Sequence, residues 1–167
     1  MDLQTRTLFT NVSTPPPSLA QWDRVMRHAQ VAAGMSQGVL ALAGSWEALS
    51  IAKQLCANPP PGRADDCVAA LVVSHHNLAD LQLEAGTPDL AAGQLCHAHE
   101  TLLALMQDTP SGANLPTELR QAAWRHSRET HAGLLRYLAE HGPHPAISRA
   151  LQAGCLVVFA GVSPTRH

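Results

Sequence analysis

Residues 86–88 constrain the fold of this chain more than any other stretch. Gly86, Thr87 and Pro88 stand between two long segments in which small and apolar residues recur at helical spacing. Glycine often ends a helix in the left-handed conformation, and proline is favoured at the first helical position, where its missing N–H costs nothing. Thr87 is a favoured N-cap residue. The three residues therefore predict a tight turn between two antiparallel helices.

The segments on either side of this turn predict two helices that pack closely. Residues 63–85 carry apolar side chains at the i, i+3, i+4, i+7 spacing of one helical face. Residues 88–105 repeat small and apolar side chains at alternating steps of about four and three. The distance between packed helices depends on the side chains at their contact. Ala79, Ala91 and Ala98 are small enough for a close approach, so this stretch predicts a helical hairpin.

The rest of the chain predicts four more helices. Ser18 followed by Gln21 fits a capping box at the start of the first one. Breaks rich in glycine and proline separate these helices, which we expect at residues 19–33, 39–55, 117–141 and 146–159. The segment CLVVF, residues 155–159, is the only strand candidate, and it continues a helical pattern without a break. The predicted fold class is therefore all-α, with three antiparallel helix hairpins.

The composition predicts one helical domain. Hydrophobic residues make up 46% of the chain, which is enough for a core, and aromatic residues only 4%. Alanine and leucine favour helices, whereas strands are enriched in β-branched and aromatic residues. We expect the domain to span residues 18–160. A disordered tail at 1–17, which ends in three prolines, precedes it, and a C-terminal tail at 161–167 follows it.

Charge and hydropathy exclude several classes of function. The net charge is -2 and the pI about 6.5, so the basic surface of a nucleic-acid-binding protein is not expected. The N-terminus lacks the pattern of a signal peptide, and the longest apolar stretch near the end is too short to span a bilayer. We therefore expect a cytoplasmic protein that binds neither nucleic acid nor membrane. Its four cysteines should then be reduced thiols.

The spacing of the small residues resembles the tetratricopeptide repeat, a helix-turn-helix unit with a period of about 34 residues. The middle hairpin matches each position of that repeat with Leu78, Ala79, Gly86, Ala91, Leu95 and Ala98. The first hairpin keeps the spacing less completely, with Ala29, Ser36, Ala41 and Ala48. The third keeps Leu134, Gly142 and Leu151. The resemblance implies three hairpins stacked as a short tetratricopeptide-like superhelix. The chain is also similar to a small gammaproteobacterial family of this length, which implies no activity.

The resemblance implies a binding groove. A tetratricopeptide array is a curved stack whose inner groove is lined by the first helix of each hairpin. His76, Asp80 and Glu84 are spaced i, i+4 and i+8, so they form one stripe, and a nearby carboxylate is expected to favour the charged form of His76. Met26 is a further groove position. Carried onto this sequence, the groove positions that we take as the partner-binding site are Asp23, Gln30, His76, Asp80, Glu84, Arg136 and Glu140.

The acidic character of the expected groove indicates the class of partner. Tetratricopeptide domains that clamp chaperone C-termini carry Lys and Asn at the positions held here by His76 and Asp80, so that clamp is missing. The expected partner is another protein that offers a basic or apolar helical segment, with the protein acting as an adaptor or chaperone. A homodimer is compatible with the sequence. The alternative interpretation is that these side chains form only a solvated helix face.

Neither enzymatic activity nor a cofactor is expected, because no G-x-S-x-G, P-loop, G-x-G-x-x-G or H-E-x-x-H motif occurs. The alternative function is metal binding or metal sensing, since imidazole and thiolate suit zinc or copper. The candidate ligands are His75, Cys96 and His99. Cys96 and His99 share one helix face, and His75 lies on the antiparallel partner helix. No standard zinc spacing appears, and the competing interpretation treats His75 as a packing residue.

Overall fold

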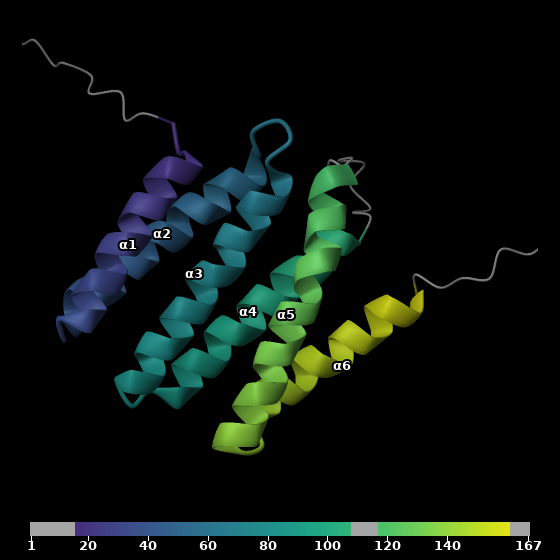
Figure 1. The fold of residues 1–167 in the computed structure, drawn as a ribbon. Helices are drawn as coiled ribbons and strands as arrows, with labels where there is room; N and C mark the ends of the chain where they lie inside the picture. Colours follow the sequence, from purple (N-terminus) through teal and green to yellow (C-terminus); the bar gives the residue numbers. More distant parts are fainter. Residues whose placement is uncertain (1–15, 108–116, 161–167) are drawn as a thin grey trace, which may run out of the picture.

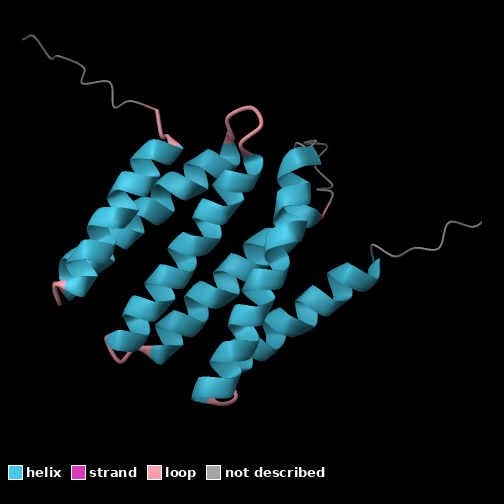
Figure 2. Ribbon diagram, in the orientation of Figure 1, coloured by secondary structure: helices cyan, strands magenta, loops and turns pink. Residues whose placement is uncertain are grey.

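The computed structural model describes residues 16–107 and 117–160, with side chains through residue 155. The regular structure in these ranges is helical throughout (Figure 2). The CLVVF segment is part of the last helix and not a strand. The predicted loop at 108–116 and most of both predicted tails lie outside the described residues. The helices are α1 (Leu19–Gly34), α2 (Gly38–Ala57), α3 (Ala64–Glu84), α4 (Pro88–Met106), α5 (Thr117–His141) and α6 (Pro145–Ala160).

The helices pack as three successive hairpins, α1 with α2, α3 with α4, and α5 with α6 (Figure 1). Each hairpin also contacts the next, through α2 against α3 and α4 against α5. The first helices of the hairpins contact one another as well, because α3 touches both α1 and α5. The predicted all-α arrangement of stacked hairpins is therefore confirmed, and α1, α3 and α5 form one layer of the stack.

The turn after α3 has the predicted left-handed glycine. Gly86 has φ +72°, its N–H donates to the Leu83 carbonyl at 2.9 Å, and the Thr87 N–H donates to the Gln82 carbonyl at 2.8 Å. These two bonds form a Schellman motif, which satisfies carbonyls at the end of α3. Pro88 begins α4, as predicted. The expected cap by Thr87 is wrong, because its hydroxyl donates to the Gln82 carbonyl at 2.8 Å instead of accepting from α4.

The first hairpin uses the same turn without a glycine. Ser36 has φ 59°, and its N–H donates to the Ala33 carbonyl at 2.9 Å. The Gln37 N–H donates to the Ala32 carbonyl, also at 2.9 Å. Ser36 therefore occupies the position that Gly86 holds in the second hairpin. At the N-terminus of α1, the Ser18 hydroxyl accepts from the Gln21 N–H at 3.1 Å, which confirms the predicted cap.

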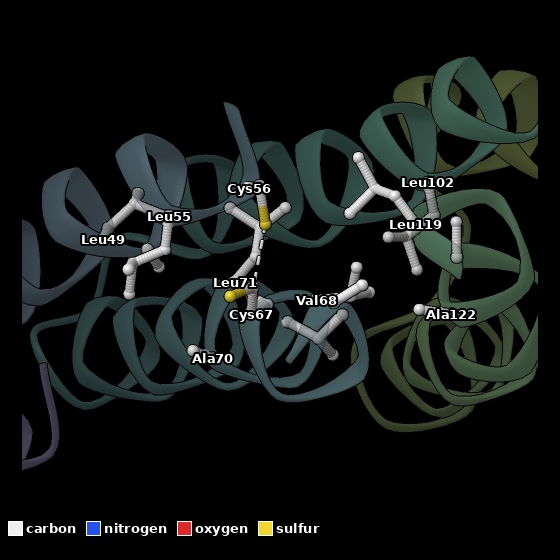
Figure 3. Packing of buried hydrophobic residues seen from close by; sticks show 14 of the residues in the cluster. Leu49, Leu55, Cys56, Cys67, Val68, Ala70, Leu71, Leu102, Leu119 and Ala122 are labelled. Carbon is white, nitrogen blue, oxygen red and sulfur yellow. Dashed lines mark hydrogen bonds between the residues drawn. The ribbon is translucent and has the colours of Figure 1, made fainter. Parts of the chain in front are cut away.

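The core consists of two buried clusters. The larger one joins α2 and α3 to α4 and α5. In Figure 3, Leu71 of this cluster lies between Leu49 and Leu55 on one side of the view and Leu102 and Leu119 on the other. The smaller one joins α3 and α4 to α5 and α6 around Leu134 and Ile147. Trp22 on α1 adds a polar link to α3, because its indole N–H donates to the Ser74 hydroxyl at 2.9 Å. The small residues of the hairpins are buried at every predicted contact position, namely Ala29, Ala41, Ala48, Ala79, Ala91 and Ala98.

Replacing Gly86 with alanine should destabilise the protein by about 1 to 2 kcal/mol, because an L-residue in the left-handed conformation crowds its own backbone. No neighbouring atom lies within 4 Å of a Cβ at this position, so the cost comes from the backbone alone. Urea denaturation measures the change. The matched control is Gly93→Ala inside α4, where a Cβ also meets nothing within 4 Å and alanine should stabilise the helix by about 1 kcal/mol. If the two variants change the free energy of unfolding equally, Gly86 does not adopt the left-handed conformation.

Replacing Ala91 or Ala98 with leucine should destabilise the protein by about 1 to 3 kcal/mol, since both positions are 0% exposed and extra methylenes would overpack the helix contact. Thermal unfolding followed by circular dichroism measures the change. Ala139 is exposed on α5, so Ala139→Leu should stay within about 0.5 kcal/mol of wild type. If the Ala91 and Ala98 variants behave like this control, the two alanines do not lie at a close crossing.

Candidate functional site

Two neighbouring hollows lie on the α1, α3 and α5 layer, and both are lined by Asp80. The first has a volume of about 150 Å³ and lies between α1 and α3, where Gln30 and Glu84 contribute to its lining. The second has a volume of about 70 Å³ and lies between α3 and α5. We call the two hollows together the Asp80 groove. The second hollow brings together four predicted site residues, His76, Asp80, Arg136 and Glu140.

The structure therefore gathers six of the seven predicted site residues, from all three hairpins. Asp23 is the exception, because its exposed carboxylate forms an ion pair with Arg27 one turn along α1, outside both hollows. The expected groove position Met26 is also wrong. It is 3% exposed, and its sulfur accepts from the Asn77 amide at 2.9 Å, because α1 packs against α3 at this point.

Carboxylates outnumber cations in the Asp80 groove. Asp80, Glu84 and Glu140 contribute three carboxylates, and Arg136 is the single guanidinium among the lining residues. Opposite charges across an interface guide encounter and select partners. The arrangement favours a ligand with basic groups over an anionic one.

His76 is held neutral in this groove. Burial lowers its pKa, and Arg136 acts in the same direction, while Glu129 and Asp80 oppose this by raising it. Gly133 on α5 faces the ring closely, since a Cβ there would lie 3.4 Å from His76 Nε2. The neighbouring carboxylates do favour the charged form, as expected, but their effect is smaller than that of burial, so the pKa of His76 is lowered overall.

Sequence reasoning missed several residues of the second hollow. Gly133 and Tyr137 of α5 line it, and Leu95 reaches it from α4. Tyr137 is buried and is held by its hydroxyl, which donates to the Pro88 carbonyl at 3.0 Å. Leu95 could have been found from the sequence, because it occupies the position of the repeat that requires a large residue between Ala91 and Ala98. Gly133 and Tyr137 had none, because α5 follows the repeat spacing only in part.

The two imidazoles among the candidate metal ligands each contact another side chain through Nδ1. His75 Nδ1 is 2.8 Å from the Gln94 side-chain oxygen, and His99 Nδ1 is 2.8 Å from the Thr130 hydroxyl. Burial raises the pKa of the Cys96 thiol to about 11, and Glu100 adds to the effect. Across residues 16–107 and 117–155, no group of three or more His, Cys, Asp or Glu side chains could hold a metal ion. The structure therefore does not bring His75, Cys96 and His99 together as a ligand set.

Comparison with known proteins places the chain in a family by its sequence. Residues 20–165 match the family described as protein of unknown function (DUF2753). The chain belongs to the DUF2753 family. The match covers all six helices, so the Asp80 groove lies entirely within the DUF2753 region. No curated protein and no solved structure matches the chain. In the described part of this DUF2753 protein, no helix has both the length and the apolar character needed to cross a membrane.

Lowering the pH from 7 to 5 should destabilise this DUF2753 protein through His75 and His99. Burial lowers the pKa of each imidazole to about 4, and both residues are at most 2% exposed. Below the imidazole pKa of the unfolded chain, about 6.5, the unfolded chain binds protons that the folded chain does not. The free energy of unfolding therefore decreases as the pH is lowered, until the pH reaches the pKa of the folded state. Each histidine should contribute a loss on the order of 2 kcal/mol over this interval.

Urea unfolding at a series of pH values measures this slope. His99→Gln removes one of the two titrating groups, so its free energy of unfolding should fall less steeply between pH 7 and pH 5, whatever its stability at pH 7. An unchanged slope in this variant would show that His99 titrates normally in the folded protein.

Proposed function

We propose that the protein is a tetratricopeptide-like adaptor of the cytoplasm that binds a helical segment of another protein in the Asp80 groove, without enzymatic chemistry. One observation carries this proposal. Six of the seven residues that we assigned to the partner-binding groove come from three separate hairpins and line two hollows that share Asp80. A set of unrelated surface residues has no reason to converge in this way.

The packing of the hairpins supports the tetratricopeptide-like assignment. Ser36, Gly86 and Gly142 all have positive φ and end the first helix of their hairpins. The alanines of the first two hairpins are buried where the repeat requires close contact. The helices have 16 to 25 residues, so the spacing between hairpins exceeds the repeat's usual period of about 34 residues. The proposed protein is thus an elongated variant of the repeat.

The chemistry of the groove supports a basic, amphipathic segment as the partner. The carboxylates of Asp80, Glu84 and Glu140 would face lysine or arginine side chains. Leu83 and Leu95 line the second hollow beside them and offer apolar contact. A helix with basic and apolar residues one turn apart presents both kinds of side chain on one face.

Reversing the charge of the groove should weaken partner capture. Asp80→Lys with Glu84→Lys replaces two carboxylates by cations, so a basic partner would be repelled and would associate more slowly. Both residues are exposed, and stability should change by about 0.5 kcal/mol or less per substitution. The measurement is a quantitative pull-down from the native host with wild type and variant as baits, at low and physiological salt.

The matched control is Glu47→Lys with Glu100→Lys, which changes the net charge equally on exposed positions of α2 and α4. Proteins lost with the groove variant but retained with the control are groove partners, and peptides from them should compete with capture. Equal recovery of every protein by the groove variant and wild type would show that the Asp80 groove is not the binding surface.

A further inference from the structure

A second cavity lies between α4, α5 and α6, apart from the Asp80 groove. Its volume is about 330 Å³, which is within the range of roughly 300 to 1,000 Å³ seen for small-molecule sites. Leu103 and Met106 of α4 give it an apolar lining. His99, Arg128, Gly154 and Cys155 also line it. None of these residues lines the Asp80 groove, so the inference does not rest on the proposed adaptor function.

The hydrogen bonds around His99 determine where its ring proton lies. The Thr130 hydroxyl donates its single proton to the Ser127 carbonyl at 3.0 Å. Its oxygen therefore accepts from His99 Nδ1 at 2.8 Å, which places the ring proton on Nδ1. Burial, with a smaller effect of His131, lowers the pKa of His99 to about 4, so the ring is neutral at pH 7. His99 Nε2 is consequently a bare acceptor.

This acceptor has no hydrogen-bond partner among the described residues, although His99 is only 2% exposed. It lies beside Gly154, where a Cβ would be 2.7 Å from Nε2, so only glycine leaves room for the ring. His99 and Gly154 both line the cavity, but Nε2 itself is covered by Gly154 and is not exposed to the cavity in this structure. An unpaired buried acceptor is costly, and a donor that reaches it recovers this cost.

The cavity distinguishes His99 from the other buried imidazoles. His76 Nε2 is also unpaired among the described residues, but the hollow beside it has only about 70 Å³. That space is too small for a molecule of several heavy atoms. Next to His99 the space is larger. The covering helix α6 is the last of the stack, and its main contacts among the described residues are with α4 and α5, so a small shift at Gly154 leaves the other helices in place.

We propose that this cavity binds a small, largely apolar molecule that carries one hydroxyl or N–H group. A small shift of α6 at Gly154 lets that group donate to His99 Nε2, while the apolar body contacts Leu103 and Met106. The ligand replaces the missing hydrogen-bond partner of a neutral imidazole, and no bond is made or broken. Molecules without a donor leave His99 Nε2 unpaired and therefore bind with lower affinity.

Phenol and toluene are the matched probes, since they have the same size and differ in the donor. Burial alone favours toluene, because phenol loses hydration at its hydroxyl. We expect phenol to bind about tenfold more tightly than toluene, as one hydrogen bond to a buried acceptor allows. Titrations followed by long-range ¹H–¹⁵N spectra of the histidines should show the Nε2 resonance of His99 shifting with phenol only. Tighter binding of toluene, or no shift of that resonance, would overturn the proposal.

Two variants localise the binding site. Cys155→Phe fills the cavity and should weaken phenol binding at least tenfold, whereas Gln152→Phe, at an exposed α6 position outside the lining, should leave it unchanged. His99→Leu removes the acceptor and should reverse the preference, so that toluene binds more tightly. Circular dichroism confirms folding of each variant. If Cys155→Phe and wild type bind phenol with the same affinity, phenol does not bind in this cavity and the proposal is wrong.

Discussion

The close approach of helices at small residues is the constraint on which this structure depends. Ala41, Ala48, Ala91 and Ala98 are 0% exposed, and a Cβ at Gly44 would lie 3.0 Å from the Cβ of Ala29. Because no large side chain stands between the helices at these positions, the first two hairpins pack closely. The hairpins then stack with α1, α3 and α5 side by side, and the hollows of the Asp80 groove lie between these three helices.

Buried imidazoles add directional contacts to a core that is largely apolar. His75 bonds to Gln94 across α3 and α4, and His99 bonds to Thr130 across α4 and α5. Dispersion contacts between alanines tolerate sliding, whereas a hydrogen bond at 2.8 Å requires one register between two helices. Both rings are neutral because burial lowers their pKa. Nearby cationic groups act in the same direction, and only the Gln94 hydrogen bond at His75 opposes it. The polar contacts that align the helices therefore also make the fold sensitive to acid.

The helices and the main part of the Asp80 groove could be predicted from the sequence, because periodicity and turn residues are local signals. Gly86 and the stripe from His76 to Glu84 are examples. Long-range partners could not be predicted in this way. Nothing local indicates that the Asn77 amide donates to the Met26 sulfur, or that the Thr130 hydroxyl forms a hydrogen bond with His99 Nδ1. The same limit applies to His75, Cys96 and His99, because residue types do not show that the Nδ1 atoms of the two imidazoles contact Gln94 and Thr130. Among the described residues, the three side chains do not form a ligand set.

The acidic character of the groove arises from how the chain distributes its few charges. Charged residues make up only 14% of the sequence. Arg27 pairs with Asp23, Arg63 with Asp66 and Arg125 with Asp65, all outside the groove, where exposed ion pairs contribute little stability. In the described ranges, no ion pair engages Asp80 or Glu84, and Arg136 is the only cation of the two hollows. A basic helical segment would therefore meet carboxylates whose charge is still available, and this would guide its approach to the groove.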